Sequence, residues 1–157
     1  VERLKWGVDL AKETAAREGN DILIGAYVNM VCHPDIEAAR HLVQGGLSTF
    51  ARFSVMHGNV NGTISNDQKK VLDQLHSKYN MNEHTQTDSD QASILTPDFI
   101  DEYAIVGPPQ SCIQRIKEIE SLGIDRLTVI GPTAGAEKET AREAERILAS
   151  EVLPVFQ

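Results

Sequence analysis

The feature that most constrains the fold is an almost continuous apolar run, ILIGAYVNMVC, at residues 22–32. A strand with one face in water alternates apolar and polar residues, whereas this run offers apolar side chains to both faces. Such strands are typical of parallel sheets, because the crossover connections place helices on both sides of the sheet. The run therefore predicts a buried parallel strand and, with it, a chain built from βα units.

A second strand is predicted at RLTVIG, residues 126–131, directly before the rest of a glycine-containing loop, GPTAG. Apolar residues at helical spacing predict helices in four further segments, 2–18, 34–50, 109–123 and 137–156. A short helix is also expected to start at Thr96-Pro97-Asp98. The resulting order is helix, strand, helix, insertion, helix, strand, helix, which is typical of an α/β protein.

Individual residues mark the ends and the packing of these helices. Asp35 is placed to accept the free amide hydrogens at the start of the second predicted helix. Gly123 is a natural C-cap. Gly45 and Gly46 lie inside a predicted helix, where glycine costs stability. We infer from this pair that the helix packs closely against a neighbour at that point.

Residues 54–97 differ from the rest of the chain. A turn-rich stretch, SVMHGNVNGTISNDQ, precedes a possible helix, KKVLDQLHSKYNM, and the polar run NEHTQTDSDQAS. Long excursions of this kind from a regular scaffold are functional loops, lids or disordered segments. We interpret residues 54–97 as an insertion within a single segment that spans residues 1–157.

The two predicted strands are too few to form a sheet by themselves. Both read as buried, and two parallel strands cannot close a sheet without neighbours. A complete (β/α)₈ barrel takes about 250 residues, whereas this chain has 157. The chain is therefore interpreted as a piece of something larger.

Composition excludes several classes of partner. The net charge is −8, from 23 acidic and 15 basic residues, which argues against binding nucleic acid or an anionic membrane surface. No apolar run approaches the roughly 18 residues of a membrane span. Cys32 and Cys112 lack metal-type spacing and are expected to be reduced, buried thiols of a cytoplasmic protein. The histidines are dispersed, so no metal site is expected.

Several segments carry a resemblance to a known family. The tail contains a VGPP turn before a helix, the stretch GIDRLTVIGP and the final EVLPVF. Two upstream stretches, FARFSVMHG at 50–58 and GAYVNMVCHPDIEAAR at 25–40, fit the same pattern. In this order and spacing they resemble the luciferase-like monooxygenase superfamily. The nearer similarity is to its deazaflavin-dependent branch, which includes methylenetetrahydromethanopterin reductase.

This resemblance implies a fold and an activity. The fold is a (β/α)₈ TIM barrel, of which this chain would form the C-terminal portion with strands seven and eight, their covering helices and the insertion. The activity is that of an oxidoreductase that transfers hydride between coenzyme F420 and a small-molecule substrate. Flavin-using relatives instead reduce oxygen on reduced FMN, so FMN is the alternative cofactor. Because the amino-terminal half holds much of the cofactor site, the segment alone is expected to be inactive.

In such barrels the chemistry lies at the carboxyl ends of the strands. After the first strand this rule selects Asn29, predicted to bind the cofactor, followed by Met30, Cys32 and His33. After the second strand it selects Gly131, Pro132 and Thr133.

The loop of Gly131, Pro132 and Thr133 is interpreted as a wall of the cofactor site. Glycine permits close approach, and Thr133 offers a hydroxyl and an amide near a helix N-terminus. The alternative is a β-to-α turn without a ligand. A P-loop is excluded, because the Gly-Lys-Ser/Thr of the Walker pattern is missing.

Arg52 and His57 lie where the scaffold opens into the insertion, on either side of Ser54. A guanidinium suits phosphate and carboxylate, so Arg52 is predicted to bind the cofactor's phosphate and glutamate tail or an acidic substrate. An imidazole exchanges protons near neutral pH, so His57 is the predicted catalytic proton donor. The alternative is a helix-capping arginine and a solvated loop histidine.

A non-enzymatic function is the second hypothesis. A small α/β domain of this length would expose strand edges that need a partner, and a second copy of the chain supplies one. Under either hypothesis we expect a homo-oligomer.

Overall fold

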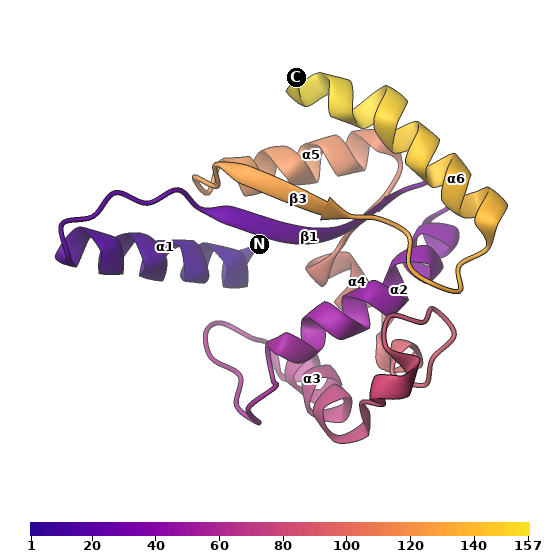
Figure 1. Cartoon of the computed structure of the whole chain (residues 1–157), viewed down its shortest axis with the longest axis horizontal. Coiled ribbons are helices and arrows are strands. Elements are labelled where there is room, and N and C mark those ends of the chain that lie inside the picture. The colour runs from indigo at the N-terminus through magenta and orange to yellow at the C-terminus, as the bar shows by residue number, and fades with distance from the viewer.

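The computed structural model describes residues 1–157 and contains six α-helices and three strands (Figure 1). The helices are α1 (Glu2–Arg17), α2 (Ile36–Phe53), α3 (Asn66–Lys78), α4 (Pro97–Tyr103), α5 (Pro109–Glu120) and α6 (Lys138–Ile147). The strands are β1 (Gly25–Cys32), β2 (Ile105–Gly107) and β3 (Arg126–Ile130). Short 3₁₀ turns are η1 (Met81–Glu83), η2 (Ala92–Ile94) and η4 (Leu153–Phe156), and a π-helical turn, η3 (Leu148–Val152), continues α6. No helix combines the length and the apolar character needed to cross a membrane.

The three strands form one parallel sheet in the order β2-β1-β3. β1 pairs with β3 from Gly25 to Asn29 on one edge and with β2 from Met30 to Cys32 on the other. The parallel sheet was predicted, but the prediction of only two strands is wrong. β2 has three residues and lies between a short helix and a Gly-Pro-Pro turn. So short a segment has no periodicity of its own, and its pairing with β1 depends on contacts distant in sequence.

Helices cover both faces of the sheet. Val31 belongs to an apolar core with side chains of α2, α3 and α4, whereas its neighbours Met30 and Cys32 pack against α5 and η3. Adjacent residues of a strand point to opposite faces, so these two cores lie on opposite sides of β1. Figure 1 shows the same layers, with α5 and α6 on one side of the strands and α2, α3 and α4 on the other.

The burial of the strands differs from the prediction. The carboxyl half of β1, from Asn29 to Cys32, is buried as predicted, but the amino half is partly exposed and Tyr27 is 69% exposed. β3 has no fully buried residue. The prediction that both strands are buried throughout is therefore wrong. The physical reason is that β2 reaches only the carboxyl end of β1, and β3 has a single strand neighbour.

The two predicted helix starts are confirmed. The Asp35 carboxylate accepts the amides of Glu37 and Ala38 at 2.9 and 3.3 Å. The Thr96 hydroxyl caps α4, which begins at Pro97 as expected. The prediction of Gly123 as a C-cap is wrong, because α5 ends at Glu120 and its C-cap is Ser121. Gly123 lies in the turn that follows, with a φ of +80° that glycine adopts at little cost.

Gly45 and Gly46 pack closely, as their position in the sequence predicts. A Cβ at Gly45 would lie 2.5 Å from the carbonyl oxygen of Thr85. A Cβ at Gly46 would lie 2.5 Å from the Thr133 methyl carbon and 3.1 Å from Asn29 Oδ1. The two glycines therefore let α2 approach two other segments at once.

Residues 54–97 fold against α2. The apolar face of α3 joins the α2 core, and Thr87 and Gln91 are completely buried. Gln91 accepts the Asn80 amide at 2.8 Å and donates to the Glu83 carbonyl at 3.0 Å. Buried hydrogen bonds rather than apolar periodicity hold this polar run in place.

Candidate functional site

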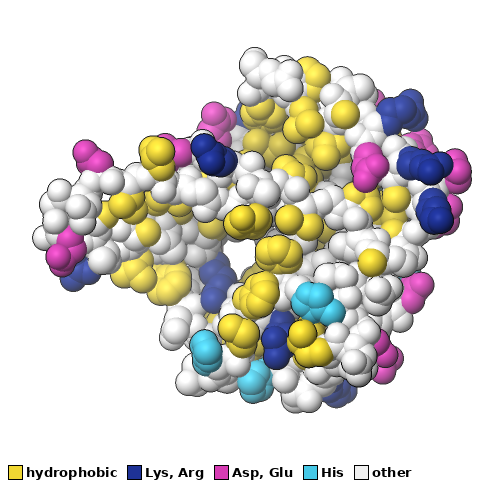
Figure 2. Space-filling view, viewed as in Figure 1, with side chains coloured by type: hydrophobic (Ala, Val, Ile, Leu, Met, Phe, Trp, Pro, Cys, Tyr) yellow, Lys and Arg dark blue, Asp and Glu magenta, His cyan; other side chains and the backbone are white.

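A cavity of about 860 Å³ lies between α1, β1, α2 and the residues where α4 meets β2. It runs beside the part of β1 that β2 does not reach. Its walls are mostly apolar, with polar groups contributed by residues that include Asn29, Gln68 and Tyr103. In Figure 2, hydrophobic side chains border a hollow between α1 and the α2–α3 part of the molecule. A mostly apolar cleft with a few polar groups is the common form of a small-molecule site.

Two residues that line this cavity each have a buried polar atom without a hydrogen-bond partner. Asn29 is 4% exposed and its Oδ1 is unpaired, and the hydroxyl of Tyr103 is also unpaired. Buried polar groups are almost always paired, so two orphans beside one cavity indicate groups that a ligand can satisfy. Burial raises the pKa of Tyr103, so its hydroxyl keeps its proton and can donate.

Aromatic side chains form one wall of the cavity. The rings of Tyr27 and Phe50 lie 6.4 Å apart, and Phe53 packs edge-on against Phe50 at 5.9 Å. Tyr27 and Phe50 line the cavity, and Tyr27 is 69% exposed, so its face is free to contact a ligand. This wall suits a planar ring system, because aromatic rings stack with an offset or meet edge to face.

The predicted loop after β3 is fastened to α2. Thr133 donates both its amide and its hydroxyl to the Leu42 carbonyl at 3.1 Å, and its hydroxyl lies 3.1 Å from that of Thr87. A Cβ added at Gly131 would have no atom within 4 Å, so that side of the loop is open. Gly131, Pro132 and Thr133 do not line the large cavity, whereas Asn29 does. The structure nonetheless brings Asn29 and Thr133 together, on either side of Gly46.

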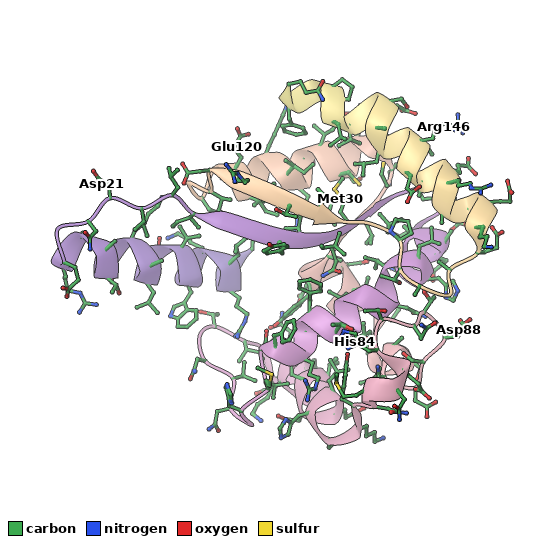
Figure 3. The ribbon with its side chains drawn as sticks, viewed as in Figure 1. Asp21, Met30, His84, Asp88, Glu120 and Arg146 are labelled. Atoms are coloured by element: carbon green, nitrogen blue, oxygen red, sulfur yellow. The ribbon has the colours of Figure 1, made fainter.

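Arg52 and His57 lie apart from that junction. The Arg52 guanidinium stacks over the ring of Tyr79 at 4.6 Å and has no acidic partner. The Tyr79 hydroxyl lies 3.0 Å from Thr49 Oγ1 and 2.8 Å from His84 Nδ1. His57 is exposed and forms no hydrogen bond or ion pair. Figure 3 places His84 on the α2–α3 side of the molecule, away from Met30 in the sheet.

The residues that follow Asn29 turn away from the cavity. Met30 and Cys32 are completely buried in the core beneath α5, and the prediction of buried cysteines is confirmed. His33 accepts the Asp35 amide at 3.1 Å, and its Nε2 lies 3.8 Å from a Glu143 carboxylate oxygen.

The sequence profile of the luciferase-like monooxygenase family matches residues 1–126. The match includes the stretches 25–40 and 50–58 and ends before the loop that follows β3. It covers well over half of the 157 residues.

Among solved structures, the coenzyme F420 dependent tetrahydromethanopterin reductase from Methanopyrus kandleri is similar to this chain. The TM-score is 0.62 at 17% sequence identity, with 98% of this chain and 42% of that chain covered. The chain thus spans less than half the length of that reductase, and the likeness establishes a shared parallel α/β fold. Together with the family profile, it leads to one conclusion: this chain belongs to the luciferase-like monooxygenase family.

Proposed function

We propose that this chain is the C-terminal part of a luciferase-like (β/α)₈ barrel and belongs to a coenzyme F420-dependent oxidoreductase. Membership of the family supports an oxidoreductase, and the structural relative named above is described as F420-dependent. β1 and β3 pair directly along Gly25–Asn29, as neighbouring strands seven and eight of a barrel do, although β2 separates them in the sequence. The edge of β1 beside the cavity is left for a further strand.

The observation that carries the cofactor proposal is the unpaired amide of Asn29. An amide next to a cavity matches the polar edge of a planar heterocycle, since it can both accept and donate hydrogen bonds. The adjacent aromatic wall of Tyr27 and Phe50 matches the face of such a ring. The residues therefore fit a deazaflavin, and they fit the isoalloxazine of FMN in the same way. When bound, coenzyme F420 would supply the carbon that exchanges hydride with a small-molecule substrate.

Arg52 would hold the anionic end of the cofactor. Stacking on Tyr79 fixes the guanidinium without using its hydrogen-bond donors, and no carboxylate of this acidic chain pairs with it. A planar guanidinium in this state is ready to bind phosphate or carboxylate in a bidentate manner.

The other predicted residues have smaller parts in the proposal. Gly131 and Pro132 would form a wall of the site, and Thr133 would position that wall through its bonds to Leu42. His57 stays the proposed proton donor, and its exposure leaves it accessible to substrate. We further propose that the segment alone binds the cofactor poorly and is inactive, that residues 54–97 are an insertion, and that the enzyme is a homo-oligomer.

The test is a titration of the full-length protein with coenzyme F420 and with FMN, followed by deazaflavin absorbance and flavin fluorescence. We expect affinity for the deazaflavin, and Asn29→Ala is expected to weaken it about tenfold, the equivalent of one hydrogen bond of about 1.4 kcal/mol. The exposed Asn59→Ala is the matched control and should bind normally. Affinity for FMN without affinity for coenzyme F420 would contradict the deazaflavin proposal and would favour a flavin-dependent monooxygenase.

The alternative, a small self-associating α/β domain, is favoured by one observation. The chain exposes Tyr27 on a strand and leaves part of an edge of β1 unpaired. Size-exclusion chromatography with light scattering, together with urea denaturation, separates the two proposals. A discrete dimer that unfolds cooperatively would favour the self-associating domain, whereas an aggregate would favour the barrel segment. A monomeric 17.3 kDa chain that unfolds cooperatively would contradict both.

A further inference from the structure

The two cysteines meet in the core although they are far apart in sequence. Cys32 is the last residue of β1, and Cys112 lies in the first turn of α5. Gly107, the β2 partner of Cys32, accepts a hydrogen bond from Cys112 Sγ at 3.4 Å. Both thiols are 0% exposed, and they belong to the same apolar cluster. Figure 3 shows this part of the core near Met30, between the strands and the helices α5 and α6.

The two thiols are also inequivalent. The neighbouring Cys112 side chain lowers the pKa of Cys32, although burial opposes the shift. The Cys32 side chain and burial raise the pKa of Cys112 well above its usual range. Cys112 Sγ is also held by its hydrogen bond to the Gly107 carbonyl, whereas Cys32 Sγ has no such bond. In dithiols that react in two steps, one cysteine is oxidised first and the second resolves the product, and this geometry assigns the first step to Cys32.

We propose that Cys32 and Cys112 are a redox modification site, in which a peroxide converts the two thiols into an intramolecular disulfide between β1 and α5. In the first step the Cys32 sulfur attacks the peroxide, takes one oxygen as a sulfenic acid and releases water. In the second step the Cys112 sulfur displaces that oxygen, the S–S bond forms and a second water leaves. One hydrogen peroxide is reduced to two waters, and the two thiols lose two electrons and two protons.

Access to the thiols depends on the C-terminal segment. Val152 of η3 is completely buried in the same cluster as the cysteines. The following turn, η4, has no buried residue, and Val155 and Phe156 are 47% and 37% exposed. Segments with few buried contacts open more readily than the core. A small oxidant therefore reaches the dithiol when this segment lifts away.

The experiment treats the folded protein with hydrogen peroxide, then adds N-ethylmaleimide in denaturant and maps the peptides without reduction. We expect a Cys32–Cys112 cross-linked peptide that carries no maleimide, and dithiothreitol should restore two alkylated thiols. Met81 and Met30 are internal controls in the same sample. Met81 is 61% exposed and should gain oxygen, whereas Met30 is fully buried and should not while the fold is intact.

Single variants test the order of the two steps. In Cys112→Ser, Cys32 is expected to form a sulfenic acid that dimedone traps. In Cys32→Ser, dimedone labelling of Cys112 is expected to be several-fold lower than that of Cys32 in Cys112→Ser, because Cys112 Sγ stays hydrogen-bonded to the Gly107 carbonyl. The proposal is overturned if both thiols remain alkylatable once Met81 is oxidised. A cross-link that forms only after Met30 is oxidised would overturn it as well, because the bond would then belong to the unfolded chain.

Discussion

The closest helix packing in the structure gives the sharpest prediction, the effect of Gly45→Ala. A Cβ at this position would lie 2.5, 2.7 and 2.8 Å from Thr85 O, Gln86 C and Thr87 N. All three are backbone atoms, so no side-chain rotation relieves the clash. Either α2 or the segment 85–87 must move.

The expected cost follows from two opposing effects. Alanine is favoured over glycine inside a helix by up to about 1 kcal/mol, whereas overpacking costs about 1–3 kcal/mol. Movement of the segment also strains two hydrogen bonds of Thr87, from its amide to Ala134 O at 2.9 Å and from Gln44 Nε2 to its carbonyl at 2.9 Å. Each contributes about 1 kcal/mol. We therefore expect a net loss of about 2–4 kcal/mol in the free energy of unfolding.

Urea denaturation followed by circular dichroism measures this loss, with an unchanged m-value as the sign that only stability changed. The matched control is Gly7→Ala in α1, where an added Cβ meets no atom within 4 Å. That variant should be as stable as the parent chain or up to about 1 kcal/mol more stable. If Gly45→Ala were as stable as Gly7→Ala, the packing of residues 85–87 on α2 would be refuted.

Three further predictions concern single side chains. Gln91→Leu should lower the free energy of unfolding by about 1–2 kcal/mol, because it removes two part-buried hydrogen bonds to backbone groups. The exposed Gln74→Leu is its control in urea denaturation. Hydrogen bonds from the Thr140 hydroxyl and from two backbone amides lower the pKa of Glu137 from 4.5 to about 2. The stability that this carboxylate contributes is therefore present above pH 4.5 and is lost as the pH falls toward 2. In Glu137→Gln, the urea midpoint should therefore change less with pH between 4.5 and 2 than it does in the parent chain. Asp35→Ala should cost about 1 kcal/mol through loss of the α2 N-cap, read from the thermal midpoint, and an unchanged midpoint would count against the cap.

Local patterns in the sequence were sufficient for much of the fold. The apolar run of β1, the Asp35 cap and the Gly45-Gly46 pair each depend on neighbouring residues, and each was predicted. β2 was missed because three residues are too few to show an alternation of apolar and polar side chains. The burial of Thr87 and Gln91 was missed because polar residues in a loop are expected in water, and their partners lie elsewhere in the chain.

Some residues of the candidate site were likewise predicted from the sequence, and others were not. Asn29 was selected as a residue that follows the first strand, and it lines the cavity, but it lies within β1, which continues to Cys32. Tyr103 belongs to a short helix and Tyr79 to the end of another, and nothing in either segment signals a site. Tyr103 reaches the cavity only when α4 packs on α2, and Tyr79 meets Arg52 only when α3 packs on α2.

The staggered pairing of β1 has a consequence for any strand that joins it. On the edge opposite β3, the free stretch runs from Gly25 to Asn29, and Ile105 of β2 closes it at Met30. At about 3.3 Å per residue, an incoming strand has about 16 Å of backbone to pair with before it meets β2. β2 therefore sets both the length and the register of the next strand.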